Sequence, residues 1–391
     1  MTLSDVSATF QRNWRRQVEE HRAMLRAVCD HPLSSDASAR ARAEYLISQA
    51  QALAFNLVVA PRPESPRFFT HLAADPSVYT WGLSDSTIIH YIAQIDIAKR
   101  YVVYGDVFRW DLDSLVMVDL DGLMQFVATG QLEKAQQVAI TMDPNAFRVE
   151  LGGACEGADV HREFPRQARW LILRRWAPSA GSKVGIAPLE EPPPITAMDG
   201  VPLLNRLQAA ATFSSYLINA SLAYKERSTL RSPGINSFGP PWKSFGGECG
   251  QSAYFSLADD ETLLIEMSCD DYKQWRLRST DCWGQVVNYI DYQSSIDQTD
   301  IRVDDDGIIR IVVSPTDEGA FNWLSTVAFR QGGCELARLD GRSFEISASS
   351  VNKSDLDRMI HAGRCGGPIA AETRNKMLAA RRSRLLDVWD Y

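Results

Sequence analysis

The stretch from Ser232 to Arg338 constrains the fold of this chain more strongly than any other. It is a series of short β-branched and aromatic runs separated by Gly, Pro and Asp-Gly turns. Asp306-Gly307 lies between two β-branched runs, which is a strong short-range signal for a hairpin. Three successive acids, Asp304 to Asp306, would repel one another in a core, so we expect this turn to lie in solvent. The pattern predicts antiparallel β-structure.

Two of these runs have different strand patterns. Thr262–Met267 is apolar apart from Glu266 and is flanked by acidic residues, which is typical of a strand buried on both faces. Residues 272–278 alternate in polarity, which is the period of a half-buried strand. Because burying a lone charge is costly, Glu266 needs a partner, and we expect Arg276 or Arg278 to supply it.

Helical and further β patterns fill the rest of the chain. Apolar residues recur near helical spacing in residues 4–30, 38–59, 201–227, 354–360 and 370–389. Strand patterns occupy residues 88–97, 100–104, 115–120, 124–129, 137–140, 147–151 and 170–174. The fold class that follows is α+β and β-rich, with two antiparallel β-sandwich-type units, a helical N-terminus, a central helix and a helical C-terminal tail.

The order of these segments predicts five regions. A chain of 391 residues is long for a single hydrophobic core, which favours more than one domain. The regions are a helical N-terminal part (1–64), a first β unit (65–176), a proline-rich linker with the central helix (177–230), a second β unit (231–345) and a helical tail (346–391). Prolines recur in the first half of the third region, so we expect an extended linker there.

The two β units share an internal similarity. Asp85-Ser-Thr-Ile-Ile aligns with Asp260-Glu-Thr-Leu-Leu, and this offset places Ile88–Tyr104 on Leu263–Ser279. At a slightly different offset, the segment that starts at Asp143 resembles the segment that starts at Asp305. We hypothesise that the units are diverged copies of one another. The alternative is that unrelated strand–turn–strand segments resemble each other.

Several motifs of the second β unit occur in the order found in a known bacterial family. They are Ser-Pro-Gly-x-Asn-x-Phe-Gly-Pro-Pro-Trp from Ser232, Asp260-Glu261, Tyr272–Trp275, Trp283, Asp306-Gly307 and Asn322-Trp323-Leu324. Residues 232–338, and more faintly residues 81–105, resemble the DUF1214 family of unknown function, which often accompanies a DUF1254 segment. The resemblance implies a β-sandwich-like fold. It also implies a hydrophobic small-molecule ligand, because genes of this family often lie near genes for steroid or aromatic breakdown.

Familiar cofactor and partner classes leave no signature in the sequence. The six histidines are scattered without metal-ligand spacing, and nucleotide-binding glycine motifs and the Gly-x-Ser-x-Gly elbow are absent, so we expect no metal and no cofactor. A net charge of −8 argues against nucleic acid as a partner. With no apolar run of membrane-spanning length and no apolar signal core, we expect no membrane partner and a cytoplasmic location. Seven cysteines without a Cys-x-x-Cys pair are interpreted as reduced thiols.

His90 is the candidate catalytic residue, with Asp85 and Asp96 as the acids that could orient it. It lies inside an apolar strand, and its unperturbed pKa near neutrality suits general acid–base chemistry. The alternative is a structural histidine bonded within the core, with strand-end acids that serve as solvated turn residues.

Aromatic residues are dense in the second β unit and form the candidate lining of an apolar pocket. The alternative is that most of them are core residues, since aromatic side chains bury large areas. The candidate substrate-binding residues are Tyr91, Asn236, Trp242, Tyr272, Trp275, Trp283, Tyr292 and Trp323.

Three functions are compatible with this sequence. The first is a cofactor-independent lyase, isomerase or hydrolase that acts on an aromatic or polycyclic molecule. The second is a non-catalytic β-sandwich protein that binds a small molecule or a carbohydrate, and the third is a structural protein. Trp14, Leu25, Leu386 and Trp389 predict that the helical ends pack on the sandwiches or on a second copy of the chain, which suggests a homo-oligomer.

Overall fold

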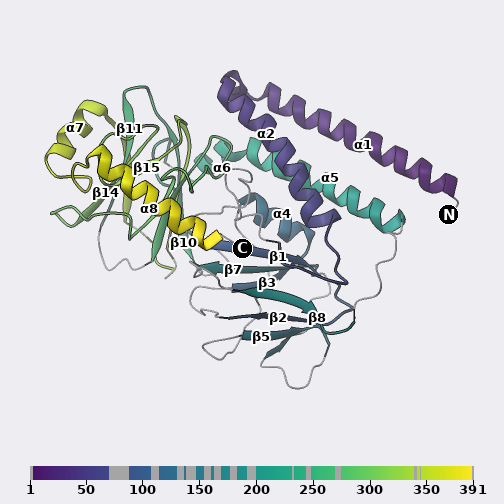
Figure 1. The fold of residues 1–391 in the computed structure, drawn as a ribbon. Coiled ribbons are helices and arrows are strands. Elements are labelled where there is room, and N and C mark those ends of the chain that lie inside the picture. The colour runs from purple at the N-terminus through teal and green to yellow at the C-terminus, as the bar shows by residue number, and fades with distance from the viewer. Residues whose placement is uncertain are drawn as a thin grey trace. The chain divides into compact units, whose positions relative to one another are not determined.

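The chain forms two compact units in the computed structural model (Figure 1). The first is built from residues 1–71, 90–175 and 182–222, and the second chiefly from residues 223–391. The structure describes residues 3–69, 88–106, 114–129, 136–137, 147–153, 160–162, 169–176, 183–191, 200–230, 233–243, 248–268, 274–338, 341–343 and 345–389.

Helices make one layer of the first unit. They are α1 (Leu3–Asp30), the 3-10 turn η1 (Pro32–Ser35), α2 (Ala37–Ala54), the π-helical turn η2 (Phe55–Val59), α4 (Leu120–Thr129) and α5 (Gly200–Leu222). Asp36 caps α2, because its Oδ1 accepts a hydrogen bond of 2.7 Å from the Ala39 amide. Helix α5 packs against α1, α2 and α4 and therefore holds this layer together.

Two sheets form the rest of the first unit. Sheet 1 has the strand order β1 (Ile88–Gln94), β7 (Trp170–Trp176), β3 (Ser114–Val118), β4 (Gln136–Gln137). Sheet 2 has the order β6 (Val160–Arg162), β5 (Phe147–Leu151), β2 (Tyr101–Gly105), β8 (Val184–Pro188). Strand β1 is buried at six of its seven positions, so both faces of sheet 1 are covered. Figure 1 shows the helical layer on one face of sheet 1 and sheet 2 on the other.

The second unit is a β-sandwich with helical additions. Sheet 3 has the order β13 (Ser295–Asp297), β12 (Trp275–Thr280), β16 (Gln331–Arg338), β10 (Cys249–Ser256), β9 (Trp242–Lys243). Sheet 4 has the order β15 (Trp323–Ser325), β14 (Ile308–Ser314), β11 (Glu261–Ser268), β17 (Ile346–Asn352). The added helices are α6 (Tyr224–Leu230), α7 (Lys353–His361) and α8 (Ala371–Trp389).

Apolar side chains of sheets 3 and 4 interdigitate in one core. Trp275 and Leu336 of sheet 3 pack in the same cluster as Leu263 and Ile311 of sheet 4, all of them fully or almost fully buried. A smaller cluster on the other face of sheet 4 joins Trp323 to α7. Successive side chains of each strand point to opposite faces of its sheet, so every second side chain lies between the two sheets, as in other β-sandwiches.

Both units repeat one strand topology. Strands β1-β7-β3-β4 of sheet 1 correspond in order to β10-β16-β12-β13 of sheet 3, and β6-β5-β2-β8 of sheet 2 to β15-β14-β11-β17 of sheet 4. The pairs β5–β6 and β14–β15 are both parallel. One constant shift in residue number converts the pairing Tyr101–Leu151 into Leu263–Val313, and Tyr101–Pro188 into Leu263–Ser350. The same shift converts Glu150–His161 into Val312–Trp323.

This repeat supports the duplication hypothesis but corrects its alignment. Aligning Asp85 with Asp260 places β1 on β11, whereas the strand order places β1 on β10, so that alignment is wrong. Aligning Asp143 with Asp305 agrees with the shift in residue number that relates sheet 2 to sheet 4. Because short strand–turn segments resemble one another in sequence, only the pairing partners of each strand decide which alignment of the two units is correct.

Several sequence expectations differ from the structure. Strand β17 lies inside the expected helical tail and pairs with β11 of the second unit. Residues 124–129, expected as a strand, belong to helix α4, whose start is capped because Asp119 Oδ1 accepts from the Gly122 amide over 2.9 Å. Strand β8 lies inside the expected linker and pairs with β2. The helix expected over residues 201–227 is divided into α5 and α6. Of the strand expected at 137–140, residues 138–140 lie outside the described part of the chain.

The fold class is confirmed: the protein is α+β and β-rich, with helices at both ends. Among the helices in the described ranges, none combines the length and the apolar character needed to cross a membrane.

The two helical ends pack differently from the expectation. In α8, Leu385 is buried while Leu386 is 43% exposed, and the side chain of Trp389 lies outside the described residues. In α1, Met24 and Val28 are buried, Leu25 is half-buried and Trp14 is 59% exposed. The C-terminal half of α1 is therefore packed within this chain, and the aromatic side chain near its start is not.

Candidate ligand-binding site

His90 is a buried residue of sheet 1. The residue is 4% exposed, and its ring meets Phe126 of α4 edge-on, with 4.9 Å between ring centroids. Tyr91 lies on the other face of the strand, is 5% exposed and packs against Phe68. Asp96 belongs to the turn after β1, where its Oδ1 accepts from the Ala98 amide over 3.0 Å. The structure thus assigns Asp96 to a turn, and Asp85 lies outside the described residues.

The expected aromatic cluster is divided between several environments. Trp275 is in the core between sheets 3 and 4, and Trp323 is on the opposite face of sheet 4, where its Nε1 donates to Ser314 Oγ over 2.9 Å. Trp283 is 1% exposed, whereas Tyr292 is 47% exposed. Tyr272 lies outside the described residues. Trp275 and Trp323 therefore do not line one common pocket.

Asn236 and Trp242 have local structural roles. Asn236 adopts a φ of 63°, and its Oδ1 accepts from the Ser256 amide while its Nδ2 donates to the Ser256 carbonyl. The ring of Trp242 lies against Gly250, where a Cβ would come within 2.1 Å of it, and its Nε1 donates to Ser252 Oγ. Both residues fasten the glycine- and proline-rich loop to β10.

Glu266 is paired, but not with the expected arginine. The register of β11 and β14 places it opposite Arg310, whose Nε donates to Glu266 Oε1 over 2.7 Å. Arg276 and Arg278 belong to sheet 3 and bond to Glu248 and Glu335, at 3.5 and 2.8 Å. Burial, together with the charge of Arg278, lowers the pKa of Arg276 to about 9. The expected pairing was wrong because the partner of a strand residue follows from register, which the sequence does not show.

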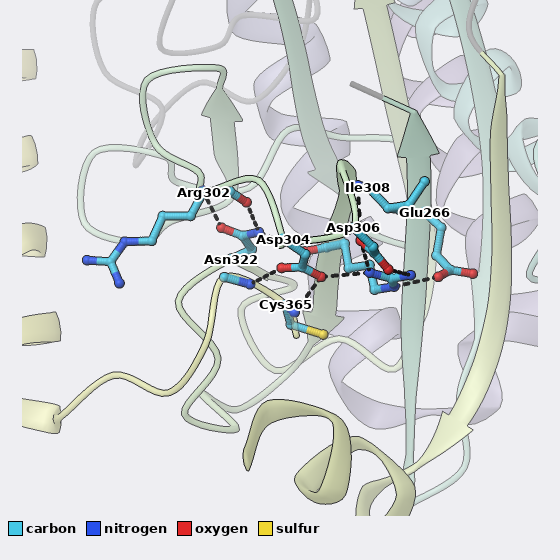
Figure 2. A network of polar contacts seen from close by, with 9 residues as sticks. Glu266, Arg302, Asp304, Asp306, Ile308, Asn322 and Cys365 are labelled. Atoms are coloured by element: carbon cyan, nitrogen blue, oxygen red, sulfur yellow. Dashed lines mark hydrogen bonds and ion pairs between the residues drawn. The ribbon is translucent and has the colours of Figure 1, made fainter. Parts of the chain in front are cut away.

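Arg310 also bonds to the acidic turn that precedes its strand. Glu266, Asp304 and Asp306, which are labelled in Figure 2, all accept hydrogen bonds from its guanidinium group, with Nη1 2.9 Å from Asp304 Oδ2 and Nη2 2.8 Å from Asp306 Oδ2. Asp304 is 6% exposed, which contradicts the expectation that the whole turn lies in solvent. It is stabilised there because its carboxylate also accepts from the amides of Cys365 and Gly366.

This network is structural rather than catalytic in character. Each carboxylate in it is engaged by Arg310, and Asn322 bonds to the backbone of Arg302 and Arg310. Burial raises the pKa of the Cys365 thiol to about 12, so the thiol is protonated and unreactive near neutral pH. Groups of three or more His, Cys, Asp or Glu side chains suited to a metal ion are absent from the ranges that the structure describes.

A cleft in the helical layer of the first unit is the strongest candidate site. Its volume is about 570 Å³, and it lies between α1, the end of α2 with η2, and α5. We call it the α1–α5 cleft. Most of its wall is apolar, and the apolar residues include Val18, Met24, Leu25, Ala54, Val59 and Leu207. Cavities of about 300–1,000 Å³ with apolar walls and a few polar groups are typical of small-molecule sites.

Two exposed aromatic side chains lie at this cleft. Trp14 of α1 is 59% exposed and Phe55 of η2 is 54% exposed, and both line it. Phe55 begins the π-helical turn that continues α2, and such turns occur frequently at functional sites. Large aromatic surfaces beside an apolar cavity favour ligands with flat apolar rings.

A few polar side chains line the same cleft. The His21 Nδ1 lies within hydrogen-bonding distance of the Gln51 amide nitrogen. Glu20 Oε1 is paired with Arg16 Nε at 2.8 Å, and Gln17 donates to the Leu207 carbonyl over 3.2 Å. Sequence reasoning missed this site because it treated the N-terminal helices only as packing elements. The available signals were Trp14 and His21, which are two turns apart on one helix.

Comparisons with known proteins identify the fold only. No protein-family model matches the sequence, and no curated protein matches it. An uncharacterised protein from Burkholderia cenocepacia has a similar crystal structure, with a TM-score of 0.72 and 17% identity over 90% of this chain and 99% of that chain. A Vibrio parahaemolyticus protein matches with a TM-score of 0.41 and 11% identity over 78% of this chain and 96% of that chain, a likeness too low to support an argument. The likeness is one of fold.

Proposed function

We propose that the protein binds a hydrophobic small molecule with an aromatic or polycyclic body in the α1–α5 cleft. The observation that carries this proposal is the cleft itself, a cavity of about 570 Å³ with a largely apolar wall and the exposed rings of Trp14 and Phe55. Leaving such rings in water is unfavourable, and a bound ligand would remove part of their apolar surface from it. The resemblance of the second β unit to DUF1214 agrees with a hydrophobic ligand but does not locate it.

A second candidate is cofactor-independent catalysis in the same cleft, of the lyase, isomerase or hydrolase type. It is favoured by the presence of an imidazole and a carboxylate, His21 and Glu20, in the wall of an apolar cavity. Such groups can transfer protons to and from a bound molecule. His90 is buried in another layer and does not line this cleft. If a His21→Gln variant still binds the ligand but no longer converts it, the result supports catalysis. If the variant still converts the ligand, His21 is not the group that transfers the proton.

The binding proposal is tested by filling the cleft. Ala211 of α5 lines it, and the neighbouring Thr212 is exposed and does not. In Ala211→Phe the ring occupies cleft volume, so we expect binding of the two-ring probe 2-naphthol to fall at least tenfold, while Thr212→Phe binds as the unmodified protein does. Calorimetric titration measures the affinity, and thermal unfolding shows whether each variant is folded.

Two outcomes contradict the binding proposal. The first is a folded Ala211→Phe variant that binds 2-naphthol with unchanged affinity. The second is an unmodified protein that does not bind the probe and is a dimer by light scattering, with a Trp14→Ser variant that is a monomer. That result identifies the cleft as a contact between two copies of the chain.

A further inference from the structure

The two nitrogens of the His21 imidazole have different surroundings in the α1–α5 cleft. Nδ1 lies within hydrogen-bonding distance of the side-chain amide nitrogen of Gln51, and both residues line the cleft. Within the described part of the chain, no residue forms a hydrogen bond with His21 Nε2, and this nitrogen is not buried. A molecule in the cleft can therefore reach it.

The contact with Gln51 determines which nitrogen of the imidazole carries the proton. An amide nitrogen donates hydrogen bonds and has no lone pair with which to accept one, so His21 Nδ1 is the acceptor in this contact. A neutral imidazole has one N–H group, which is then at Nε2. The accessible nitrogen of His21 is therefore a hydrogen-bond donor.

The other donors in the wall of the cleft are bonded to the protein or lie largely in solvent. Gln17 and Ser214 each donate to a main-chain carbonyl of α5, over 3.2 and 2.9 Å. Arg22 is 61% exposed and paired with an acidic neighbour, so water and salt screen its charge. His21, by contrast, is half-buried and has an N–H group that the described residues leave unused.

This donor lies near the aromatic part of the cleft. Gln51 and Phe55 are four residues apart, so about 6 Å of helix separates them along its axis. A two-ring body that packs on Phe55 can therefore direct a substituent towards the imidazole that Gln51 contacts. A single polar contact of this kind beside an apolar wall is typical of sites that orient small molecules.

We propose that the ligand of the α1–α5 cleft carries a carbonyl group on its ring body, and that the carbonyl oxygen accepts a hydrogen bond from His21 Nε2. This inference rests on the proposed function and narrows its ligand class to aryl ketones, aromatic aldehydes and quinones. A carbonyl oxygen has lone pairs and no proton, so it is the direct complement of an N–H donor.

Two probes of nearly the same shape test the inference. They are 2-acetonaphthone, which has a carbonyl oxygen, and 2-isopropenylnaphthalene, which has a methylene group in its place. Equilibrium dialysis against the full chain measures both affinities. In His21→Phe a ring remains but the N–H group is lost, so we expect the ratio of the ketone affinity to the hydrocarbon affinity to fall about fivefold. Because each protein is tested with the same two probes, their different solubilities in water cancel in this comparison.

A control variant and a spectroscopic measurement locate the effect. Arg22→Met is the control, because Arg22 also lines the cleft and carries N–H donors, and we expect it to leave the affinity ratio unchanged. Nitrogen NMR of the histidine rings reports the protonated nitrogen in the unmodified protein, with the His21 signals assigned by their absence in His21→Gln. We expect the proton on Nε2, and a shift of the Nε2 signal with the ketone but not with the hydrocarbon.

The possible failures are distinguishable. If the affinity ratio is unchanged in a folded His21→Phe variant, or falls equally in Arg22→Met, the carbonyl inference is overturned and the proposed hydrophobic site stands. A proton on Nδ1 of His21 in the unmodified protein also overturns it. If neither probe binds and 2-naphthol does not bind, the proposed function is overturned together with the inference.

Discussion

Arg310 lies directly opposite Glu266 in the antiparallel register of β14 and β11, and its Nε donates to Glu266 Oε1 over 2.7 Å. The same guanidinium bonds to Asp304 and Asp306 in the turn before its strand. One side chain therefore ties the middle of sheet 4 to the turn that begins β14. Asp304 in turn holds the amides of Cys365 and Gly366, so the contact extends to the segment after α7.

Replacing Arg310 should destabilise the second unit. In Arg310→Met the buried carboxylate of Asp304 loses its only cationic partner among the described contacts, and breaking such a pair costs about 3–5 kcal/mol. Urea unfolding followed by tryptophan fluorescence measures the loss. The control is Arg358→Met on α7, whose side chain is 79% exposed and which should change stability by less than about 0.5 kcal/mol. Equal stability of the two variants would contradict this account.

Asp306 should make the protein acid-sensitive in a defined range. The hydrogen bond from Arg310 lowers its pKa to about 2 in the folded state, compared with about 3.9 in an unfolded chain. The unfolded state therefore binds the proton more readily, so the stabilisation is complete above about pH 4 and is lost as the pH falls towards 2. Unfolding free energies measured between pH 2 and 5 should fall less steeply in Asp306→Asn. An Asp306→Asn variant with the pH slope of the unmodified protein would contradict this account.

Arginine side chains of helix α8, as well as apolar ones, attach it to the sandwich. Arg381 is 7% exposed and donates to the backbone carbonyls of Tyr289, over 2.7 Å, and Ser295. Two turns earlier, Arg374 bonds to Asp317 over 3.0 Å and to the Ala320 and Phe321 carbonyls. The helix is thus held at two points by donors that reach into the sandwich.

Removing one of these points should loosen the helix. Arg381→Ala leaves two carbonyls without their donor, and we expect a loss of about 2–4 kcal/mol. Arg384→Ala on the same helix is the control, because that side chain is 56% exposed and lies 3.7 Å from Asp300. Hydrogen exchange of the α8 amides should rise in Arg381→Ala and stay unchanged in Arg384→Ala. Unchanged exchange in both variants would show that Arg381 does not hold the helix.

Local sequence patterns predict the fold class, but they do not predict the contacts that strand register sets. The apolar run Thr262–Met267 is a buried strand, as the sequence indicated. Asp306-Gly307 is a turn before β14, but residues 301–303 form no strand, so the hairpin expected there is wrong. The partner of Glu266 was assigned wrongly, because any nearby arginine satisfies the charge and only strand pairing selects Arg310. The sequence predicts a strand over residues 124–129, which form part of helix α4, because short apolar runs fit both periods.

The candidate site was less predictable than the fold. The density of aromatic residues in the second unit suggested one pocket, but strand alternation sends Trp275 into the core, and Trp323 lies on the opposite face of sheet 4. The α1–α5 cleft depends on the distance between helices that are far apart in the sequence. The periodicity of apolar residues within one helix gives no information about the distance between two helices. In the sequence, only Trp14 and His21 indicate a site there.

The aromatic residues of the second unit should therefore respond to mutation as structural residues. Trp275 is 1% exposed and packs between sheets 3 and 4, so Trp275→Ala should cost about 3–5 kcal/mol through lost burial and a residual cavity. Trp283, also 1% exposed, should behave alike. Tyr292 is 47% exposed, and Tyr292→Ala should change the free energy of unfolding by less than about 1 kcal/mol. Because the proposed ligand occupies the helical layer of the first unit, Trp283→Ala should still bind 2-naphthol wherever it is folded. A folded Trp283→Ala variant with near-normal stability and weakened binding would return the ligand to the aromatic residues of the second unit.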